Sequence, residues 1–169
     1  LDFAAVWRSN DSLKILGVYG WAYFPPANIP GKTENGQNIT FSNQIEYYII
    51  QDRGNYNPAS NGNNAKKYGE AIINGIVYEF WVADRINQPM LTGTGNFKQY
   101  FSVPKNTRDH RRKGVISISK HFKEWEKSGM KILECPLYEI ALKVESYSHS
   151  SSGAGSAKVT KNILSPVLF

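Results

Sequence analysis

Three things are scarce in this chain of 169 residues: cysteine, long apolar runs and apolar residues at helical spacing. The single cysteine, Cys135, excludes an internal disulfide. Its apolar neighbours Ile132, Leu133 and Leu137 indicate a small buried thiol rather than a reactive one. No run approaches the ~20 apolar residues that cross a bilayer, so we expect no membrane partner.

Histidine is also rare, and the three histidines do not fall at the spacing of paired metal ligands. We therefore expect neither a metal nor a cofactor. The formal net charge is +6, with much of the excess in residues 108–113. Such a run is usually a solvated loop, and no helix carries a basic stripe. We expect no nucleic-acid partner, although binding of an acidic polymer through this run stays open as an alternative.

Aromatic residues are plentiful, at 13% of the chain, and so are the turn-forming residues Gly, Asn and Ser. This composition, in a length suited to one domain, predicts short strands joined by polar turns. The alternation of apolar residues and the turn signals place strands at 12–21, 45–51, 68–73, 76–83, 97–103, 114–118, 132–147 and 157–163, the seventh of them broken near Cys135-Pro136.

Turn residues locate the hairpins between these strands. Asn74-Gly75 is the strongest short hairpin signal, Asn35-Gly36 predicts a hairpin inside the long loop 24–43, and residues 88–95 read as an exposed hairpin tip. One short helix is expected over 120–128, with Ser119 as N-cap and Gly129 as terminator. The whole pattern predicts an all-β fold, a sandwich or jelly roll with one short α-helix.

Two glutamates stand in strand-like stretches, each with a tyrosine two residues further along. They are Glu46 and Glu145, followed by Tyr48 and Tyr147 on the same faces of their strands. A buried carboxyl group is costly unless it has a partner or a task. Paired carboxyl groups are what glycoside hydrolysis uses, one to protonate the leaving oxygen and one to attack the sugar or activate water. The hypothesis is a polysaccharide-binding groove with two carboxylates.

An ordered set of motifs over nearly the whole chain carries a family resemblance. These motifs are VYGW at 18–21, IEYYII at 45–50, GNYNP at 54–58, RINQP at 85–89, FKQYFSV at 97–103, HFKEW at 121–125 and YEIALKVESY at 138–147. Together they resemble family 11 glycoside hydrolases, the small endo-β-1,4-xylanases. The resemblance implies a curved two-sheet β-jelly roll with a mobile thumb hairpin, and retaining hydrolysis of xylan outside the cell by a secreted enzyme.

The resemblance also implies roles for individual residues. Glu46 would be the nucleophile and Glu145 the acid/base. The substrate-binding residues would be Tyr19, Trp21, Tyr48, Arg85 and Gln99 near the nucleophile, Pro89 in the thumb, and Tyr56, Tyr138 and Tyr147 as further sugar contacts. We expect Glu46 to stay ionised, helped by the hydroxyl groups of Tyr19 and Tyr48 and by Arg85.

Family members have further N-terminal strands before the segment that matches residues 1–21. We therefore expect residues 1–163 to be a catalytic domain that lacks these strands, with 164–169 as a C-terminal tail. A sandwich without them would expose a sheet edge, so we expect a separate N-terminal polypeptide to complete the domain. The alternative is a non-catalytic polysaccharide-binding β-sandwich or an inactive xylanase fragment.

Overall fold

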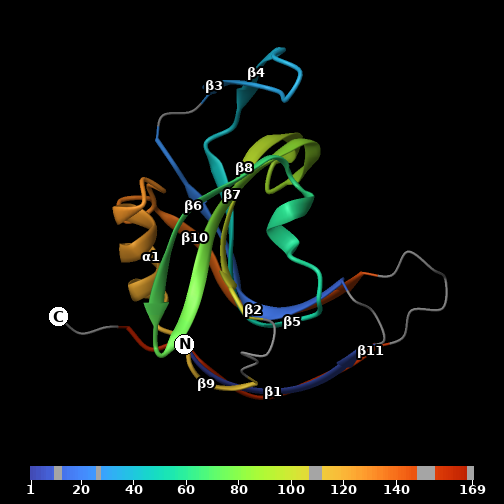
Figure 1. Cartoon of the computed structure of the whole chain (residues 1–169), viewed down its shortest axis with the longest axis vertical. Helices are drawn as coiled ribbons and strands as arrows, with labels where there is room; N and C mark the ends of the chain where they lie inside the picture. Colours follow the sequence, from blue (N-terminus) through green and yellow to red (C-terminus); the bar gives the residue numbers. More distant parts are fainter. Residues whose placement is uncertain (10–12, 26–27, 107–111, 148–154, 167–169) are drawn as a thin grey trace.

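The computed structural model describes residues 1–9, 13–25, 28–106, 112–147 and 155–166 (Figure 1). The strands in these ranges are β1 (Asp2–Ser9), β2 (Leu13–Tyr23), β3 (Ile29–Lys32), β4 (Asn38–Phe41), β5 (Gln44–Arg53), β6 (Asn63–Ile73), β7 (Ile76–Met90), β8 (Gly93–Pro104), β9 (Lys113–Val115), β10 (Leu137–Tyr147) and β11 (Gly155–Ile163). A 3-10 helix, η1 (Pro58–Asn61), and an α-helix, α1 (Ile118–Lys127), complete the described elements. The all-β prediction is confirmed, while β1, β3 and β4 were not among the predicted strands.

Two sheets pack against one another. The larger has six strands in the order β10-β2-β5-β8-β7-β6, and the smaller has three in the order β11-β1-β9. In Figure 1 the smaller sheet lies beneath β2 and β5, and α1 stands beside β6 and β10. The β3–β4 hairpin projects from the opposite end of the molecule. The fold is thus a sandwich in which only one face of the larger sheet meets the second sheet.

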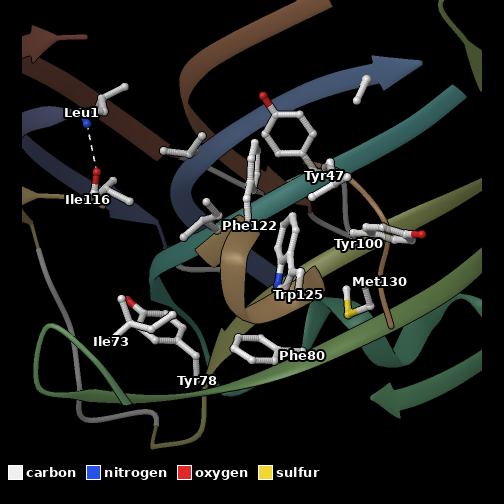
Figure 2. Packing of buried hydrophobic residues seen from close by; sticks show 14 of the residues in the cluster. Leu1, Tyr47, Ile73, Tyr78, Phe80, Tyr100, Ile116, Phe122, Trp125 and Met130 are labelled. Carbon is white, nitrogen blue, oxygen red and sulfur yellow. Dashed lines mark hydrogen bonds between the residues drawn. The ribbon is translucent and has the colours of Figure 1, made fainter. Parts of the chain in front are cut away.

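The main core fills the space between the two sheets and under α1. Alternate β1 residues, Phe3, Ala5 and Trp7, point into it. Figure 2 shows the aromatic centre of this core, in which Phe122 and Trp125 stack at 5.3 Å and both meet the Tyr47 ring edge-on. The helical i, i+3 pair Phe122 and Trp125 was predicted to share a face, and here that face is buried.

Hairpin turns follow the predicted turn residues. Asn74 and Gly75 both take positive φ, 52° and 81°, between the paired ends of β6 and β7. Two successive positive φ values are what a type I′ turn needs, and Asn-Gly adopts them most readily. Gly36 also has positive φ, between β3 and β4, so the second predicted hairpin is confirmed.

Two boundaries differ from the sequence prediction. Helix α1 begins at Ile118 with Ser117, not Ser119, as its N-cap, and Ser117 makes no side-chain capping bond. Its hydroxyl oxygen instead accepts a hydrogen bond from Asn74 of the β6–β7 turn. Residues 132–136 are not strand, because the N–H groups of Ile132 and Leu133 donate to the Glu126 carboxylate. The predicted end at Gly129 is confirmed by its φ of 85°.

A single glycine fixes the position of β10 relative to β5. A Cβ atom at Gly20 of β2 would meet both the Tyr47 hydroxyl and the Glu139 carbonyl oxygen. Because Gly20 has no side chain, the Tyr47 side chain can cross over β2. Its hydroxyl donates a hydrogen bond to the Glu139 carbonyl oxygen at 2.6 Å. The strand carrying Glu46 is thereby tied to the strand carrying Glu145 across the strand between them.

Candidate active site

The predicted site residues gather on the face of the larger sheet that is turned away from the second sheet. Directly paired residues of neighbouring strands point to the same face. Trp21 pairs with Glu46, and Glu46 pairs with Gln99 across the parallel β5–β8 ladder. Tyr19 pairs in turn with Tyr48. We call the face that carries these five residues the site face.

Glu46 lies at the centre of the site face and is only 8% exposed. The Tyr48 hydroxyl donates a hydrogen bond to its Oε1 at 3.1 Å, and the Gln99 amide donates to its Oε2. Burial raises the pKa of Glu46, while the two donors and the nearby Lys143 ammonium oppose that rise. The carboxylate is therefore held in place by donors that favour its charged form.

Tyr19 links Glu46 to the aromatic part of the site face. Its hydroxyl accepts a hydrogen bond from the Trp21 indole N–H, and its ring meets the Tyr48 ring edge-on at 5.2 Å. Burial and then the charge of Glu46 raise the pKa of Tyr19, which keeps its hydroxyl protonated. Trp21 itself is buried and packs against Phe97. Its position is therefore fixed by Phe97 on the one hand and by the hydrogen bond to Tyr19 on the other.

Glu145 reaches the same face from β10, two strands away from Glu46. Its Oε1 accepts an ion-pair contact of 2.6 Å from Lys143 Nζ, and its side chain is 16% exposed. Its buried Oε2 has no hydrogen-bond partner among the described residues. The charge of Glu145 contributes to raising the pKa of Glu46, so the two carboxyl groups interact electrostatically. Residues far apart in the sequence are brought together here by the sheet order alone.

Arg85 is not among the groups that act on the pKa of Glu46, while its expected role in substrate binding stays a prediction. It was expected to help keep Glu46 charged, but the cation that acts on Glu46 is Lys143. Arg85 instead donates to the Gln88 side chain at 3.3 Å, and its charge lowers the pKa of Tyr56, which burial raises. The Arg85 Nε atom is buried and has no hydrogen-bond partner in the part of the chain described here.

The predicted thumb is the β7–β8 hairpin, whose strands pair from Met90 and Gly93 inward. Its tip is fastened to the start of β5 by the buried Gln44. The Gln44 amide donates to the Thr92 hydroxyl at 2.8 Å, and its carbonyl oxygen accepts from the Leu91 N–H at 3.0 Å. Pro89 is exposed near this tip. The hairpin is thus held to the strand that carries the predicted nucleophile.

The remaining predicted contacts lie on β10. Tyr138 is 64% exposed, and its ring meets that of Tyr23 edge-on at 6.2 Å. Tyr147 ends β10, and its side chain is outside the described part of the structure. Among the described residues, no group of three or more His, Cys, Asp or Glu side chains could hold a metal ion. Within the same ranges, no helix has the length and apolar character to cross a membrane.

Sequence reasoning missed two residues of the site, Lys143 and Gln44. Each stands two positions before a predicted catalytic glutamate, and therefore on the same side of its strand. The period-2 rule that linked Glu46 with Tyr48 could have found both.

The sequence pattern of the family described as "Glycosyl hydrolases family 11" matches residues 1–160. The chain belongs to glycosyl hydrolase family 11. Among curated members, it is 36% identical over 152 residues to endo-1,4-beta-xylanase A of Thermoclostridium stercorarium, covering 88% of this chain and 20% of that protein. It is 33% identical over 168 residues to endo-1,4-beta-xylanase 11A of Botryotinia fuckeliana, covering 94% and 69%.

Solved structures agree with this family assignment. The fold of this family 11 chain superposes on the crystal structure of wild-type ENZbleach xylanase with a TM-score of 0.69 at 27% identity. The match covers 94% of this chain and 56% of that one. The chain therefore spans just over half the length of a solved xylanase, and between a fifth and about two thirds of the length of the curated relatives named above.

Proposed function

We propose that this protein hydrolyses internal β-1,4-xylosidic bonds of xylan with retention of configuration. The single observation that carries the proposal is that Glu46 and Glu145 share the site face and are linked by Lys143, which pairs with Glu145 and acts on Glu46. Membership of family 11 and the names of the relatives point to xylan as the substrate. Retaining enzymes hold their two carboxyl groups about 5–5.5 Å apart, with no room for water between them.

The proposed reaction has two steps. In the first, the Glu46 carboxylate attacks the anomeric carbon while protonated Glu145 gives its proton to the departing glycosidic oxygen. The sugar is then bound covalently to Glu46, whose negative charge is gone. In the second step, Glu145, now a carboxylate, takes a proton from water, and the water oxygen displaces Glu46 from the anomeric carbon. Glu145 ends protonated and Glu46 ionised, as both began.

The other residues of the site would serve these two steps. Tyr48 and Gln99 orient the Glu46 carboxylate through the hydrogen bonds already described. The sugar-contacting residues would be Tyr19, Trp21, Tyr56, Arg85, Pro89, Tyr138 and Tyr147. Aromatic faces suit the apolar faces of sugar rings.

The first test is reducing-sugar release from soluble xylan by the protein as isolated, compared with Glu46→Gln and Glu145→Gln. We expect release by the parent protein and its loss in both variants. Proton NMR of the first products should show the β-anomer before it mutarotates, since double displacement retains configuration. Binding to xylan without release, measured by affinity electrophoresis, would instead favour the polysaccharide-binding alternative.

We also propose that a separate N-terminal polypeptide segment of family 11 type pairs with the open edge of β10. Among the described strands, only β2 pairs with β10. The inward side chains Ile140, Leu142 and Val144 pack against the main core yet remain only partly buried. An unpaired edge above half-covered apolar side chains invites an added strand.

Denaturing intact-mass spectrometry of active, monodisperse protein tests this pairing. We expect a second polypeptide mass beside that of the 169-residue chain. A sample that is monodisperse and active, but contains only this chain, would refute the proposal.

A further inference from the structure

Among the described residues, Lys143 is the one cation on the site face that interacts with both Glu46 and Glu145. Its ammonium group lies 2.6 Å from Glu145 Oε1. The same group lies 3.6 Å from the centre of the Tyr19 ring and 5.6 Å from that of the Tyr48 ring. It also acts electrostatically on Glu46, against the effect of burial. A single positive charge therefore serves both glutamates.

The two tyrosine rings limit where this charge can go. Cations are attracted to the faces of aromatic rings within about 6 Å, and both rings fall within that range. Tyr19 and Tyr48 are fixed in turn by the Trp21 hydrogen bond and by packing against Phe101 at 5.1 Å. The ammonium group is thus restrained by two aromatic rings and a carboxylate, although its side chain is 30% exposed.

The charged and titratable groups around Lys143 come from three strands. From β10 itself they are Glu145 and the partly buried Glu139, whose charge acts on Tyr19. From β2 the group is Tyr19, because Gly17, directly opposite Lys143, has no side chain. From β5 they are Glu46 and Tyr48. Acidic groups dominate this set, and Lys143 is its only cation among the described contacts.

We propose that Lys143 is a positioning residue that holds a positive charge beside Glu145 and over the Tyr19 and Tyr48 rings, and thereby sets the lower end of the pH range in which the pair is active. The inference rests on the proposed catalytic roles of the two glutamates. Catalysis by a retaining pair requires one carboxyl group charged and the other protonated, so activity follows a bell-shaped curve against pH. The two limbs of this curve belong to the coupled pair.

The Lys143 charge makes the Glu46 carboxyl group harder to protonate, against the effect of burial. Glu46 then becomes charged, and so nucleophilic, at a lower pH. The acid limb of the activity curve is displaced toward lower pH. Removing the charge should move that limb toward alkaline pH.

The experiment compares kcat/KM for xylan against pH in the parent protein, Lys143→Met and Lys143→Arg. We expect the acid limb, which follows Glu46, to move to higher pH in Lys143→Met. We expect Lys143→Arg to keep the parent limbs, because it keeps the charge. Lys98→Met is the matched control, since Lys98 also pairs with a carboxylate at 2.7 Å, lies 4.2 Å from the Phe41 ring centre and is 34% exposed. Its limbs should stay in place.

An unchanged acid limb in Lys143→Met, in protein whose Tm shows that it is folded, would overturn the proposal. Equal displacement in Lys143→Met and Lys98→Met would overturn it too, because a general effect of charge loss would then be responsible. A merely structural role for Lys143 would lower Tm and kcat together and leave the limbs where they are.

A second measurement keeps this inference separate from the xylanase proposal. The carboxyl carbons of ¹³C-labelled glutamate can be followed by NMR against pH in the parent protein and in Lys143→Met, without any turnover. If xylan is not cleaved but Glu46 titrates at higher pH in Lys143→Met, the proposed function fails and the role of Lys143 stands. If xylan is cleaved but the titration is unchanged, the role of Lys143 fails alone.

Discussion

The two strands that carry the glutamates differ in how firmly the fold holds them. All ten residues of β5 are buried, and the strand lies inside the larger sheet between β2 and β8. By contrast, β10 lies at the edge of that sheet, and none of its described side chains is fully buried. Glu46 is fixed by two uncharged donors, whereas Glu145 has one ion pair to a partly exposed lysine.

This contrast fits the different tasks proposed for the two groups. A nucleophile must be aimed at one carbon atom, and preorganised donors on a rigid strand provide that. An acid/base changes its protonation state twice in each cycle, so a site with access to solvent suits it. The comparison also locates the weak part of the sandwich at the β10 edge rather than at the centre of the sheet.

The largest effect on activity should come from replacing each glutamate by glutamine. The two variants are compared on xylan and on an aryl xyloside, whose leaving group is more acidic. On xylan, Glu145→Gln should lose roughly 10²- to 10⁴-fold in kcat/KM, the usual contribution of a general acid. An aryl xyloside with an acidic phenol needs no protonation to leave, so Glu145→Gln should still give a burst of phenolate. Glu46→Gln should give none, because no covalent intermediate can form. Stopped-flow absorbance measures both; a burst from Glu46→Gln would reverse the assignment.

Core truncations should destabilise β5 more than β10. Ile49→Ala on β5 removes a side chain with no exposed surface, and we expect it to lower the free energy of unfolding by about 2–5 kcal/mol. Leu142→Ala on β10 removes a partly buried side chain and should cost about 1 kcal/mol, since less area leaves water when it folds. Urea unfolding of both variants measures the difference. Equal losses would mean that the β10 edge is covered in solution.

The packed side of the larger sheet should also make stability depend on pH. His121 of α1 is buried against Ser102 of β8, and burial lowers its pKa from 6.5 to about 3. Between those values the unfolded chain binds a proton that the folded chain does not, so stability falls as the pH drops. The slope from this one group is at most about 1.4 kcal/mol per pH unit.

Urea unfolding between pH 6.5 and pH 4 isolates this contribution when the parent protein is compared with His121→Gln. Whatever its stability at neutral pH, the free energy of unfolding of the variant should fall less steeply toward acid. Parallel curves for the two proteins would contradict the assignment of the pH dependence to His121.

The smallest effect concerns the thumb hairpin, which is held at its tip by Gln44 of β5. Gln44→Ala removes two hydrogen bonds, each with a net value of about 1 kcal/mol. We expect the amide of Leu91 to exchange its hydrogen at least about fivefold faster, because local opening becomes easier. Hydrogen-exchange NMR provides the measurement. The internal reference is the Met130 amide, which lies just after α1 and donates a hydrogen bond to the Trp125 carbonyl. Unaltered exchange at Leu91 would mean that the hairpin is held by its strand pairing alone.

Local signals in the sequence were accurate where the physics is local. Asn74-Gly75 and Asn35-Gly36 form hairpins as predicted, because only a few residue types tolerate positive φ. The helix with Phe122 and Trp125 on its buried face was found for a similar reason, from i, i+3 spacing. The predicted start of that helix was wrong. The N-cap is Ser117, whose hydroxyl accepts a hydrogen bond from Asn74, a residue of a turn far away in the sequence.

The site was predicted in part. The family motifs named Glu46, Glu145, Tyr48 and Gln99, and period-2 alternation placed Glu46 and Tyr48 on one face. No rule of sequence spacing could say that β5 pairs in parallel with β8, which brings Gln99 to Glu46. The expected helper Arg85 lies elsewhere on the face, and Lys143 supplies the charge instead.

The sequence by itself determined the alternating strands, the turns, the family and the identity of the two glutamates. These follow from side-chain periodicity, backbone preferences and motifs read along the chain. Only the tertiary structure decided that Glu46 lies in a buried strand and Glu145 on an edge strand, and that Lys143 pairs with Glu145 while its charge acts on Glu46. Sheet order and burial depend on contacts between residues far apart in the chain, and those contacts exist only once the sheet has assembled.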